Sequence, residues 1–225
     1  MERVISIPKP TLERLPLYYR RLLQWREEKV SIVSSADIGK NLGIDSAQVR
    51  RDLTYFGAVG RPGIGYKVEE LISYLGELLG INNVNEAIIV GVGNLGRAIC
   101  SYPGFAPYGL SIVAFFDIDP QIVGTKIRGH EVFHVNDLIH IVKRLKIQIG
   151  IITVPAREAQ KVADQMVAGG IRAIWNFAPT RLHVPEEVII RSEDLAVGLA
   201  TLSHYLVRED LSERAEGLDR GISGS

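Results

Sequence analysis

A glycine-rich turn followed by a carboxylate is the part of the sequence best suited to chemistry. Residues 91–96 read Gly-Val-Gly-Asn-Leu-Gly, and Asp117 lies 21 residues after Gly96. Glycines allow a tight turn and a close backbone approach to phosphate, and a helix that begins there offers free N–H groups to the phosphate charge. A carboxylate at this distance can accept hydrogen bonds from ribose hydroxyls. The spacing predicts a dinucleotide site, and Asp117 favours NAD(H) because it would repel the 2′-phosphate of NADP(H).

Two further segments complete the candidate cofactor site. Thr153-Val154-Pro155 and Asn176-Phe177 each stand at the end of an apolar run that we expect to be a strand. Ligands of parallel sheets bind at the carboxyl ends of the strands, although a proline at a strand end is as often a purely structural stop. From the residues alone, the candidates for cofactor binding are Gly91, Gly93, Asn94, Leu95, Gly96, Asp117, Thr153, Val154, Pro155, Asn176 and Phe177.

A second set of side chains, near the N-terminus, is suited to DNA. A serine at 34 or 35 predicts the start of a short helix that Gly43 ends, and Asp45 or Ser46 predicts the start of a second helix. Two short helices joined by a glycine turn are typical of the helix-turn-helix motif, and also of an ordinary corner in a helical bundle. The second helix presents polar side chains outward that can contact bases or phosphates. The candidates for DNA binding on it are Ser46, Gln48, Arg50, Arg51 and Tyr55.

The segment after this helix predicts a wing. Four glycines and a proline surround Arg61 between residues 57 and 65, which indicates a hairpin whose arginine can enter a minor groove. The charge distribution agrees with a DNA-binding arm. Residues 1–67 contain 12 Lys and Arg against 7 Asp and Glu, and residues 68–225 contain 14 against 19, so the net charge of zero divides into two opposed parts.

Hydrophobic periodicity places these motifs on elements. We expect a first helix with Thr11 as its N-cap and Leu15 near the start of the helix proper, and a helix over residues 69–79 before a boundary near 80–86. Beyond it, strands are predicted at 87–92, 111–117, 131–135, 148–154, 173–177 and 188–190, and helices at 95–102, 137–145 and 156–168. The alternation predicts an α/β protein with an N-terminal winged helix-turn-helix domain and a Rossmann-type, doubly wound parallel sheet.

The C-terminal region predicts an interaction. Residues 195–208 form a helix that is apolar nearly all round, so it needs burial on more than one side, in a partner subunit or between domains. The charged and then Gly/Ser-rich stretch from residue 211 predicts a mobile tail. The expected organisation is 1–82 as a winged-helix DNA-binding domain, 83–194 as an NAD(H)-binding domain, 195–210 as a C-terminal helix and 211–225 as the tail.

Composition and missing groups exclude several classes of protein. Hydrophobic residues make up 46% and charged residues 23%, which is ordinary for a globular protein and not for a disordered chain. The lone cysteine, Cys100, excludes a disulfide scaffold. No apolar run reaches the roughly 18 residues of a membrane span. The N-terminus carries no secretory signal, so we expect a cytoplasmic protein with no membrane contact. The five histidines lack metal-ligand spacing, and the sequence after the dinucleotide domain offers neither a substrate domain nor a Tyr-x-x-x-Lys pair. We therefore expect neither an enzyme nor a metal site.

Taken together, the chain resembles the Rex family of redox-sensing transcriptional repressors, which read the NADH/NAD⁺ ratio. The resemblance covers about residues 8–208 and is carried by residues 46–57 (SAQVRRDLTYFG), 91–96, 102–105 (YPGF), 115–120 (FFDIDP) and 176–179 (NFAP). It implies a homodimer that binds an inverted-repeat operator in double-stranded DNA and exchanges its C-terminal helix between subunits. It also implies that NADH binding releases the DNA.

The resemblance further implies a redox switch and adds Tyr102 to the cofactor-binding residues. In the NADH state Asp194 would pair with Tyr102 of the partner subunit, and in the DNA-bound state with Arg20. Taken without the resemblance, Arg20 is an exposed helix charge, Tyr102 a core residue and Asp194 a helix cap. The alternatives that remain are a small NAD-dependent oxidoreductase, a CoA-binding module with an accessory helical domain, and a repressor that reads another nucleotide.

Overall fold

The computed structural model describes residues 7–55, 57, 60, 63–81, 85–204 and 206. Its contacts divide the chain into two compact units. The first holds Met1–Asn85 together with Pro103–Ser111, and the second holds Glu86–Tyr102 together with Ile112–Ser225. Residues 103–111 thus pack with the first unit, although they stand within the stretch of sequence that the strand and helix pattern assigns to the second.

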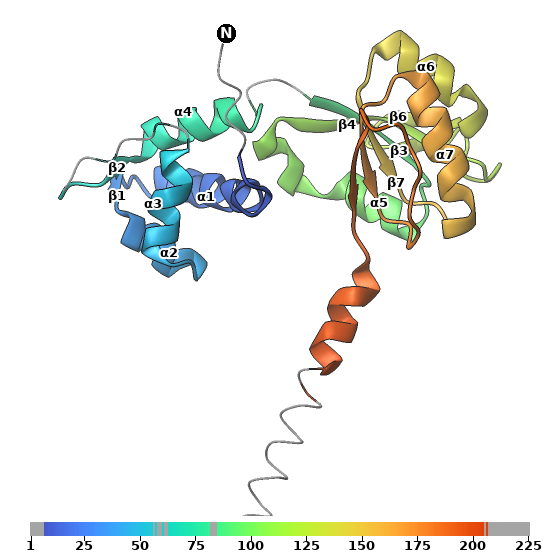
Figure 1. Ribbon diagram of the computed structural model, residues 1–225. Helices are drawn as coiled ribbons and strands as arrows, with labels where there is room; N and C mark the ends of the chain where they lie inside the picture. Colours follow the sequence, from blue (N-terminus) through green and yellow to red (C-terminus); the bar gives the residue numbers. More distant parts are fainter. Residues whose placement is uncertain are drawn as a thin grey trace, which may run out of the picture. The chain divides into compact units, whose positions relative to one another are not determined.

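The first unit is a helical domain with a small two-stranded sheet (Figure 1). Its helices are α1 (Lys9–Glu27), α2 (Ser35–Leu42), α3 (Ser46–Thr54) and α4 (Val68–Leu78), and β1 (Ile32–Val33) pairs antiparallel with β2 (Tyr66–Lys67). The predicted helix-turn-helix is confirmed, with α2 ending at Gly43 in the left-handed conformation. Ser34 and Asp37 form a reciprocal capping box at the start of α2, and Asp45 caps α3.

One detail of the first unit differs from the sequence prediction. Thr11 was expected as the N-cap of α1, and this was wrong, because the helix already begins at Lys9 after Pro8 and accommodates Pro10 in its first turn. Thr11 is instead buried. The predicted wing, a hairpin within residues 56–68, lies partly outside the described residues. Its C-terminal end contains β2, which pairs with β1 from before the helix-turn-helix. Arg61 and Pro62 lie outside the described residues.

The second unit is built on a seven-stranded sheet in the order β5-β6-β4-β3-β7-β8-β9. The strands are β3 (Asn85–Val90), β4 (Leu110–Asp117), β5 (Lys126–Ile127), β6 (His130–His134), β7 (Ile149–Ile152), β8 (Ala173–Asn176) and β9 (Ile189–Ser192). The neighbouring pairs β4–β6, β3–β7, β7–β8 and β8–β9 are parallel, and β5 adds to β6 antiparallel. The predicted parallel sheet is confirmed.

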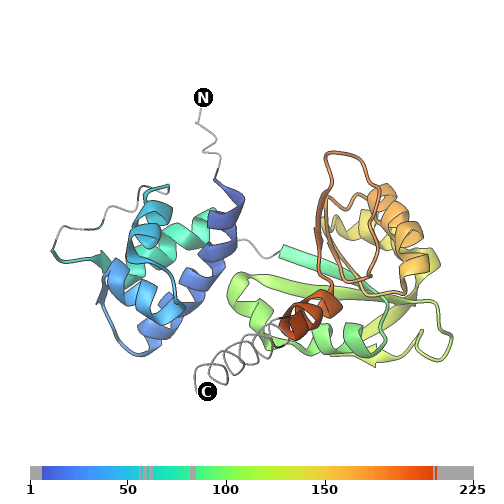
Figure 2. The same cartoon turned by 60° about the horizontal axis from the view of Figure 1, so that its bottom comes forward.

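Helices cover both faces of this sheet (Figures 1 and 2). Helices α6 (Leu138–Leu145) and α7 (Ala156–Gly169) pack together on one face, and α5 (Asn94–Ser101) lies on the other. The chain order reverses at β3, whose neighbours are β4 on one side and β7 on the other. In a doubly wound sheet the crevice at that reversal, outside the carboxyl ends of the strands, is where ligands bind. The fold therefore brings the glycine turn after β3 beside the ends of β4 and β7.

Each unit has its own apolar core. In the first, Leu15, Leu22, Val49, Leu53 and Leu75 are among the residues that α1, α3 and α4 bury together. In the second, the residues that face each other between sheet and helices include Ile88, Phe116, Leu138, Ile152 and Met166. Cys100 is buried on α5, and burial raises the pKa of its thiol to about 11, which agrees with the role of a small apolar residue.

Residues 195–204 continue the second unit as a helix that projects from it (Figure 1). Its large apolar side chains are exposed, with Leu199 at 70% and Leu202 at 61% of their full accessible surface. A helix with such side chains is stabilised only when another surface covers it. Within the described part of the chain, no helix is long and apolar enough to cross a membrane, and no cluster of His, Cys, Asp or Glu is arranged to hold a metal ion. Residues 211–225, where a mobile tail was expected, lie outside the described part.

Candidate nucleotide site and DNA-facing helix

The glycine turn between β3 and α5 is sterically restricted at two positions. Gly91 has a φ of +95°, and a Cβ there would lie 2.8 Å from the carbonyl carbon and oxygen of Thr153. A Cβ on Gly96 would collide with the carbonyl oxygen of Gly91. The Thr153 hydroxyl donates to that same oxygen over 2.5 Å, so the turn is fixed against the end of β7. Only glycine fits at 91 and 96 with this backbone.

Gly93 differs, because a Cβ there would meet nothing within 4 Å. It is the N-cap residue of α5, so it provides no side-chain cap, and the first N–H groups of the helix lack an intrahelical partner. Open space in front of free N–H groups and the positive end of a helix dipole is the arrangement that binds phosphate. The geometry of the turn therefore fits the pyrophosphate of a dinucleotide.

Asp117 ends β4 beside this turn, and its carboxylate accepts three backbone hydrogen bonds. Oδ2 accepts from the N–H of Val92 over 2.6 Å, and Oδ1 accepts from those of Ile118 over 2.7 Å and Asp119 over 3.0 Å. Asp117 thus holds the glycine turn directly, a structural role beside the expected ribose contact. A carboxylate has about four acceptor positions, so it retains capacity for a ribose hydroxyl.

A cavity of about 740 Å³ lies where these groups meet. Of the predicted cofactor residues, the structure brings the following to its wall: Gly91, Gly93, Leu95, Asp117, Thr153, Val154, Pro155 and Phe177. Asn94, Gly96, Tyr102 and Asn176 are not among the lining residues. Most of the wall is apolar, with Val90, Ile118, Ile122 and Val162 beside the predicted residues. A mainly apolar cavity with a few polar groups is typical of a cofactor site.

Asn176 has its side chain turned inward. It is fully buried, its Nδ2 donates to the carbonyls of Ala178 over 3.1 Å and Thr180 over 3.0 Å, and its Oδ1 accepts from the Ala178 N–H over 3.0 Å. The amide thus shapes the loop after β8, and this loop presents the neighbouring Phe177 to the cavity.

Sequence reasoning missed a row of cavity residues on α7. Arg157, Lys161 and Gln165 all line the cavity. They are four residues apart, so they lie on one face of the helix, one above the other. This spacing, starting directly after the Thr153-Val154-Pro155 segment, is the signal that could have found them.

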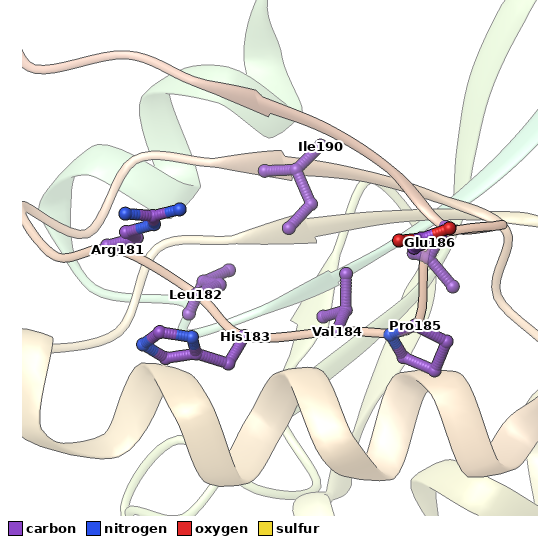
Figure 3. A pocket seen from close by; sticks show the side chains of 8 residues that line it. Arg181, Leu182, His183, Val184, Pro185, Glu186 and Ile190 are labelled. Atoms are coloured by element: carbon purple, nitrogen blue, oxygen red, sulfur yellow. The ribbon is translucent and has the colours of Figure 1, made fainter.

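A second hollow, of about 600 Å³, lies on the loop between β8 and β9 (Figure 3). Its wall includes Arg181, His183 and Glu186 beside apolar side chains. The loop is fastened to α7, because the Gln160 amide donates to the His183 carbonyl and accepts from its N–H, each over 2.8 Å. None of the sequence-predicted residues lines this hollow.

The candidate DNA-binding residues lie on α3 or beside it. Arg50, Arg51 and Tyr55 are exposed, and Ser46 and Gln48 are half-buried. The Arg50 guanidinium donates to the Ser35 hydroxyl over 3.2 Å, which ties α3 to α2. The structure thus presents two arginines on the outer face of the second helix of the motif, as the sequence pattern predicts, while Arg61 lies outside the described residues.

Beneath that face, Asp52 is buried and holds five hydrogen bonds from four side chains. Its carboxylate accepts from Thr11 Oγ1 over 3.0 Å, Tyr18 OH over 2.7 Å, Gln48 Nε2 over 2.8 Å, and both Nε (2.6 Å) and Nη2 (2.8 Å) of Arg14. Burial alone would raise the pKa of Asp52, but these hydrogen bonds outweigh it and lower the pKa to about 2. Burial and the same carboxylate raise the pKa of Tyr18. We call Asp52 with these four side chains the Asp52 hub.

The three residues of the implied switch, Arg20, Tyr102 and Asp194, are divided between the two units. Tyr102 follows α5 and is 53% exposed, and Arg20 is exposed on α1. Asp194 is exposed and accepts from the Ala196 N–H over 2.9 Å, so it caps the helix over 195–204. Tyr102 and Asp194 belong to the second unit, and Arg20 to the first.

Two family models match the chain, one in each unit. A model described as a putative DNA-binding protein N-terminus matches residues 6–54, and one described as a CoA binding domain matches residues 82–180. The first match covers the helix-turn-helix up to the end of α3. The second covers the glycine turn, Asp117 and the sheet as far as the loop after β8.

Curated relatives match over nearly the whole chain. The redox-sensing transcriptional repressor Rex of Carboxydothermus hydrogenoformans is 45% identical over 91% of this chain and 98% of its own length. The protein of the same name from Thermoanaerobacter pseudethanolicus is 38% identical over the full length of both.

Solved structures agree with these relatives. A protein named RSP, in complex with β-NAD⁺ and operator DNA, superposes with a TM-score of 0.87 at 39% identity, covering 94% of this chain and 98% of that one. The same protein in complex with β-NADH superposes with a TM-score of 0.81 at 38% identity, covering 92% and 98%.

Proposed function

The chain belongs to the Rex family of redox-sensing transcriptional repressors, and from this premise we propose how its own residues carry the family's activity. It is a DNA-binding repressor that senses the NADH/NAD⁺ ratio, not an enzyme. NADH binding to the second unit releases operator DNA from the first. The observation that carries this function is the glycine turn, which Asp117 and Thr153 hold open toward a cavity of 740 Å³ in a chain that also carries a helix-turn-helix.

The cofactor is NAD(H), and the residues at the turn fit it. Gly93 and the start of α5 receive the pyrophosphate, and Asp117 receives the ribose hydroxyls. Leu95, Thr153, Val154, Pro155 and Phe177 form the walls. Gly91 and Gly96 keep the turn narrow, and Asn94, Tyr102 and Asn176 support the site from positions outside the cavity wall. The α7 row of Arg157, Lys161 and Gln165 completes the wall.

The preference for one redox state has a physical basis in the wall. NADH and NAD⁺ differ by one hydride, and the oxidised nicotinamide carries a positive charge. Apolar side chains such as Val154, Pro155 and Phe177 offer that charge no partner, so desolvation disfavours the cation. The differential affinity for the two dimer states then sets the change in DNA affinity.

DNA is contacted by α3 and by the wing. Arg50 and Arg51 are the main candidates for bases and phosphates, with Ser46, Gln48 and Tyr55 beside them and Arg61 on the wing. The protein is a homodimer, so two copies of α3 face an operator that is an inverted repeat of double-stranded DNA. Since its target is chromosomal DNA, we place the protein in the cytoplasm.

The C-terminal helix and the switch couple the two units. We assign 1–82 as the DNA-binding domain, 83–194 as the NAD(H)-binding domain, 195–210 as a helix exchanged between subunits and 211–225 as a tail. The exposed leucines of the helix support the exchange, because a partner's surface would cover them. Asp194, at the start of this helix, is then carried to the partner subunit, where it pairs with Tyr102 in the NADH state and with Arg20 in the DNA-bound state.

The test is a titration of NADH and NAD⁺ into the protein bound to an inverted-repeat duplex. NADH should release the DNA at concentrations that saturate the protein, and NAD⁺ should require far more or fail to release it. Fluorescence anisotropy of the labelled duplex measures release, and calorimetry without DNA measures occupancy. A complex that stays intact at full NADH occupancy would contradict the sensor function.

The same titration with CoA addresses the match to a CoA binding domain. CoA carries a 3′-phosphate on its ribose, and the Asp117 carboxylate beside the turn would repel it. We therefore expect CoA neither to bind nor to release the duplex. Release by CoA at lower concentration than NADH would favour the alternative.

A further inference from the structure

Gln48 lies between the buried Asp52 hub and an exposed arginine. Its Nε2 donates to Asp52 Oδ1 over 2.8 Å, and its Oε1 accepts from Arg51 Nη2 over 2.8 Å. Only one orientation of the amide satisfies both partners, because the carboxylate requires a donor and the guanidinium requires an acceptor. Gln48 therefore links the inside of the first unit to its outer face.

The inner end of this link is rigid. Asp52 is fully buried, and Thr11, Arg14 and Tyr18 hold its carboxylate from α1. These three residues stand at i, i+3 and i+7, so they lie along one face of α1 and reach the same carboxylate together. A charge-assisted network of this kind fixes the position of each oxygen.

The outer end of the link would otherwise be free to move. Arg51 is exposed on α3, and an arginine side chain has several rotatable bonds whose freedom must be lost when it contacts DNA. Since Gln48 stands one turn of helix before both Asp52 and Arg51, it can hold the guanidinium while its own amide remains bonded to the hub.

We infer that Asp52 and Gln48 are positioning residues for operator recognition, in which the buried carboxylate orients the Gln48 amide and this amide holds the Arg51 guanidinium ready for the DNA. Gln48 then acts through Arg51 more than as a reader of bases itself, which changes the role that the sequence pattern predicts for it. The inference rests on the proposed function, in which α3 contacts the operator.

The central experiment is a double-mutant cycle with Gln48→Met and Arg51→Ala in the full-length protein. Methionine keeps the length of the side chain and removes both hydrogen bonds, and Asp52 keeps its other donors. The probes are a duplex that the wild-type protein selects from a randomised inverted-repeat pool, and a scrambled duplex of equal length at the same salt concentration. Anisotropy without NADH gives both dissociation constants for every variant.

Positioning predicts a specific and non-additive loss. Gln48→Met should weaken binding to the selected duplex roughly five- to tenfold and change binding to the scrambled duplex less than twofold. The variant with both substitutions should bind no more weakly than Arg51→Ala alone, because the relay, which is the connection from Asp52 through Gln48 to Arg51, has no role without its arginine. Additive losses would show that Gln48 contacts the DNA independently, and an unchanged Gln48→Met would show that Arg51 needs no positioning; either result overturns the inference.

Two variants test the buried part of the relay, and one serves as a control. Asp52→Asn, which removes the charge, and Tyr18→Phe, which removes one hydroxyl, should both lower the ratio of selected to scrambled affinity, Asp52→Asn more strongly. Glu28→Gln is the matched control, because Glu28 is an exposed carboxylate of the same unit that pairs with Arg21, a residue outside the Asp52 hub. It should leave both affinities unchanged. A Tyr18→Phe variant that melts at a lower temperature than wild type but keeps the full ratio would confine the hub to stability and overturn the inference.

The same measurements distinguish failure of the relay from failure of the proposed repressor function. If the wild-type protein binds both duplexes equally, the repressor function fails and the relay with it. If it is selective but Arg51→Ala is as selective as wild type, the assignment of Arg51 to the DNA fails. If only Gln48→Met and Asp52→Asn are without effect, the relay alone fails.

Discussion

Two aspartates show how the same side chain takes different roles according to its donors. Asp117 is held by three backbone N–H groups at the wall of a cavity, and Asp52 is held by four side chains in the buried interior. Backbone donors fix Asp117 while the residue still lines the cavity. Side-chain donors surround Asp52 and join two helices through it. The first arrangement suits ligand binding, and the second transmits position within the protein.

Replacing Asp117 with Asn removes its charge and keeps one of its two acceptor oxygens. The asparagine oxygen can accept either from the Val92 N–H or from the N–H groups of Ile118 and Asp119, and the negative charge that repels a 2′-phosphate is lost. We expect NADH to bind about ten- to a hundredfold more weakly and the preference for NADH over NADPH to shrink, measured by calorimetry. Asp117→Ala should lose the same selectivity and destabilise the turn more strongly than Asp117→Asn, because it keeps neither acceptor oxygen, and a lower melting temperature would report this. Unchanged selectivity in both variants would contradict the ribose assignment.

The stability of the first unit should depend on the ionisation of Asp52. Its pKa is about 2 in the folded protein against an ordinary 3.8, so the unfolded chain binds the proton more tightly. The charged form therefore contributes stability that is complete above pH 4 and is lost as the pH falls from about 4 toward 2. Over that range the free energy of unfolding should fall by about 2 kcal/mol on this account.

The measurement is urea unfolding followed by the fluorescence of Trp25, which is buried in the core of the first unit, in a Trp175→Phe background. Asp52→Asn should be less stable at pH 7 and should lack this part of the pH dependence. An equal acid response with and without Asp52 would show that the hub does not control it.

At the scale of elements, local sequence patterns predicted what local interactions determine. The glycine turn, the capping of α2 and α3, and most strands and helices of the second unit depend on neighbours within a few residues, and the structure has them close to where the pattern placed them. Thr11 was misjudged as an N-cap for the opposite reason. Its partner, Asp52, is 41 residues away in the sequence, and no local pattern announces that contact. The two-residue strand β5 was not predicted.

The cavity residues also divide into those that local sequence predicts and those that only tertiary structure brings together. Residues at strand ends were predicted because strand ends of a parallel sheet converge on one edge. Arg157, Lys161 and Gln165 of α7 were missed, because whether they line the cavity depends on how that helix lies over the sheet. The segment 103–111 was likewise missed as part of the first unit, since only tertiary contacts place it there.

That segment suggests how a change at the cofactor site reaches the DNA-binding unit. It follows Tyr102 directly, and its Tyr108 donates to the Pro16 carbonyl over 3.1 Å and packs on Tyr19 of α1, with ring centroids 6.1 Å apart. Arg20 is the next residue on α1. The switch candidates Tyr102 and Arg20 are therefore each adjacent in sequence to this contact.

Removing the Tyr108 hydroxyl should weaken the coupling between NADH binding and operator binding, and it should leave the affinity for each ligand alone nearly unchanged. For Tyr108→Phe we expect NADH and operator affinities within about twofold of wild type, and a three- to tenfold smaller effect of saturating NADH on operator affinity, the size of one hydrogen bond. The measurement is the operator dissociation constant with and without NADH. Tyr74→Phe, on the exposed side of α4, is the matched control. If NADH shifts operator affinity equally in both variants, the contact carries no coupling.

For the whole molecule, the net charge of zero is the sum of an N-terminal part with excess positive charge and a C-terminal part with excess negative charge. The excess of positive charge in residues 1–67 belongs to the unit that meets phosphates, and the excess of negative charge belongs to the unit that binds the cofactor. Neither unit alone recognises an inverted repeat, because two copies of α3 must be held at a fixed separation. The helix over residues 195–204 has exposed apolar side chains, and it is the element that we propose to be covered by a second chain.

Charging that helix should therefore separate the dimer and, with it, the recognition of the operator. Leu199→Glu with Leu202→Glu places carboxylates where the exposed apolar surface would be buried, and burial of an unpaired charge is costly. We expect a monomer by analytical ultracentrifugation at micromolar concentration. The affinity for the inverted repeat should fall about a hundredfold or more, toward that for a single half-site, because the second α3 no longer binds at high effective concentration. Leu145→Glu, at an exposed leucine on α6, should remain dimeric and bind DNA as wild type does. Should the doubly charged variant stay dimeric with full operator affinity, the dimer must rest on another surface, and the exchange of this helix would have to be abandoned.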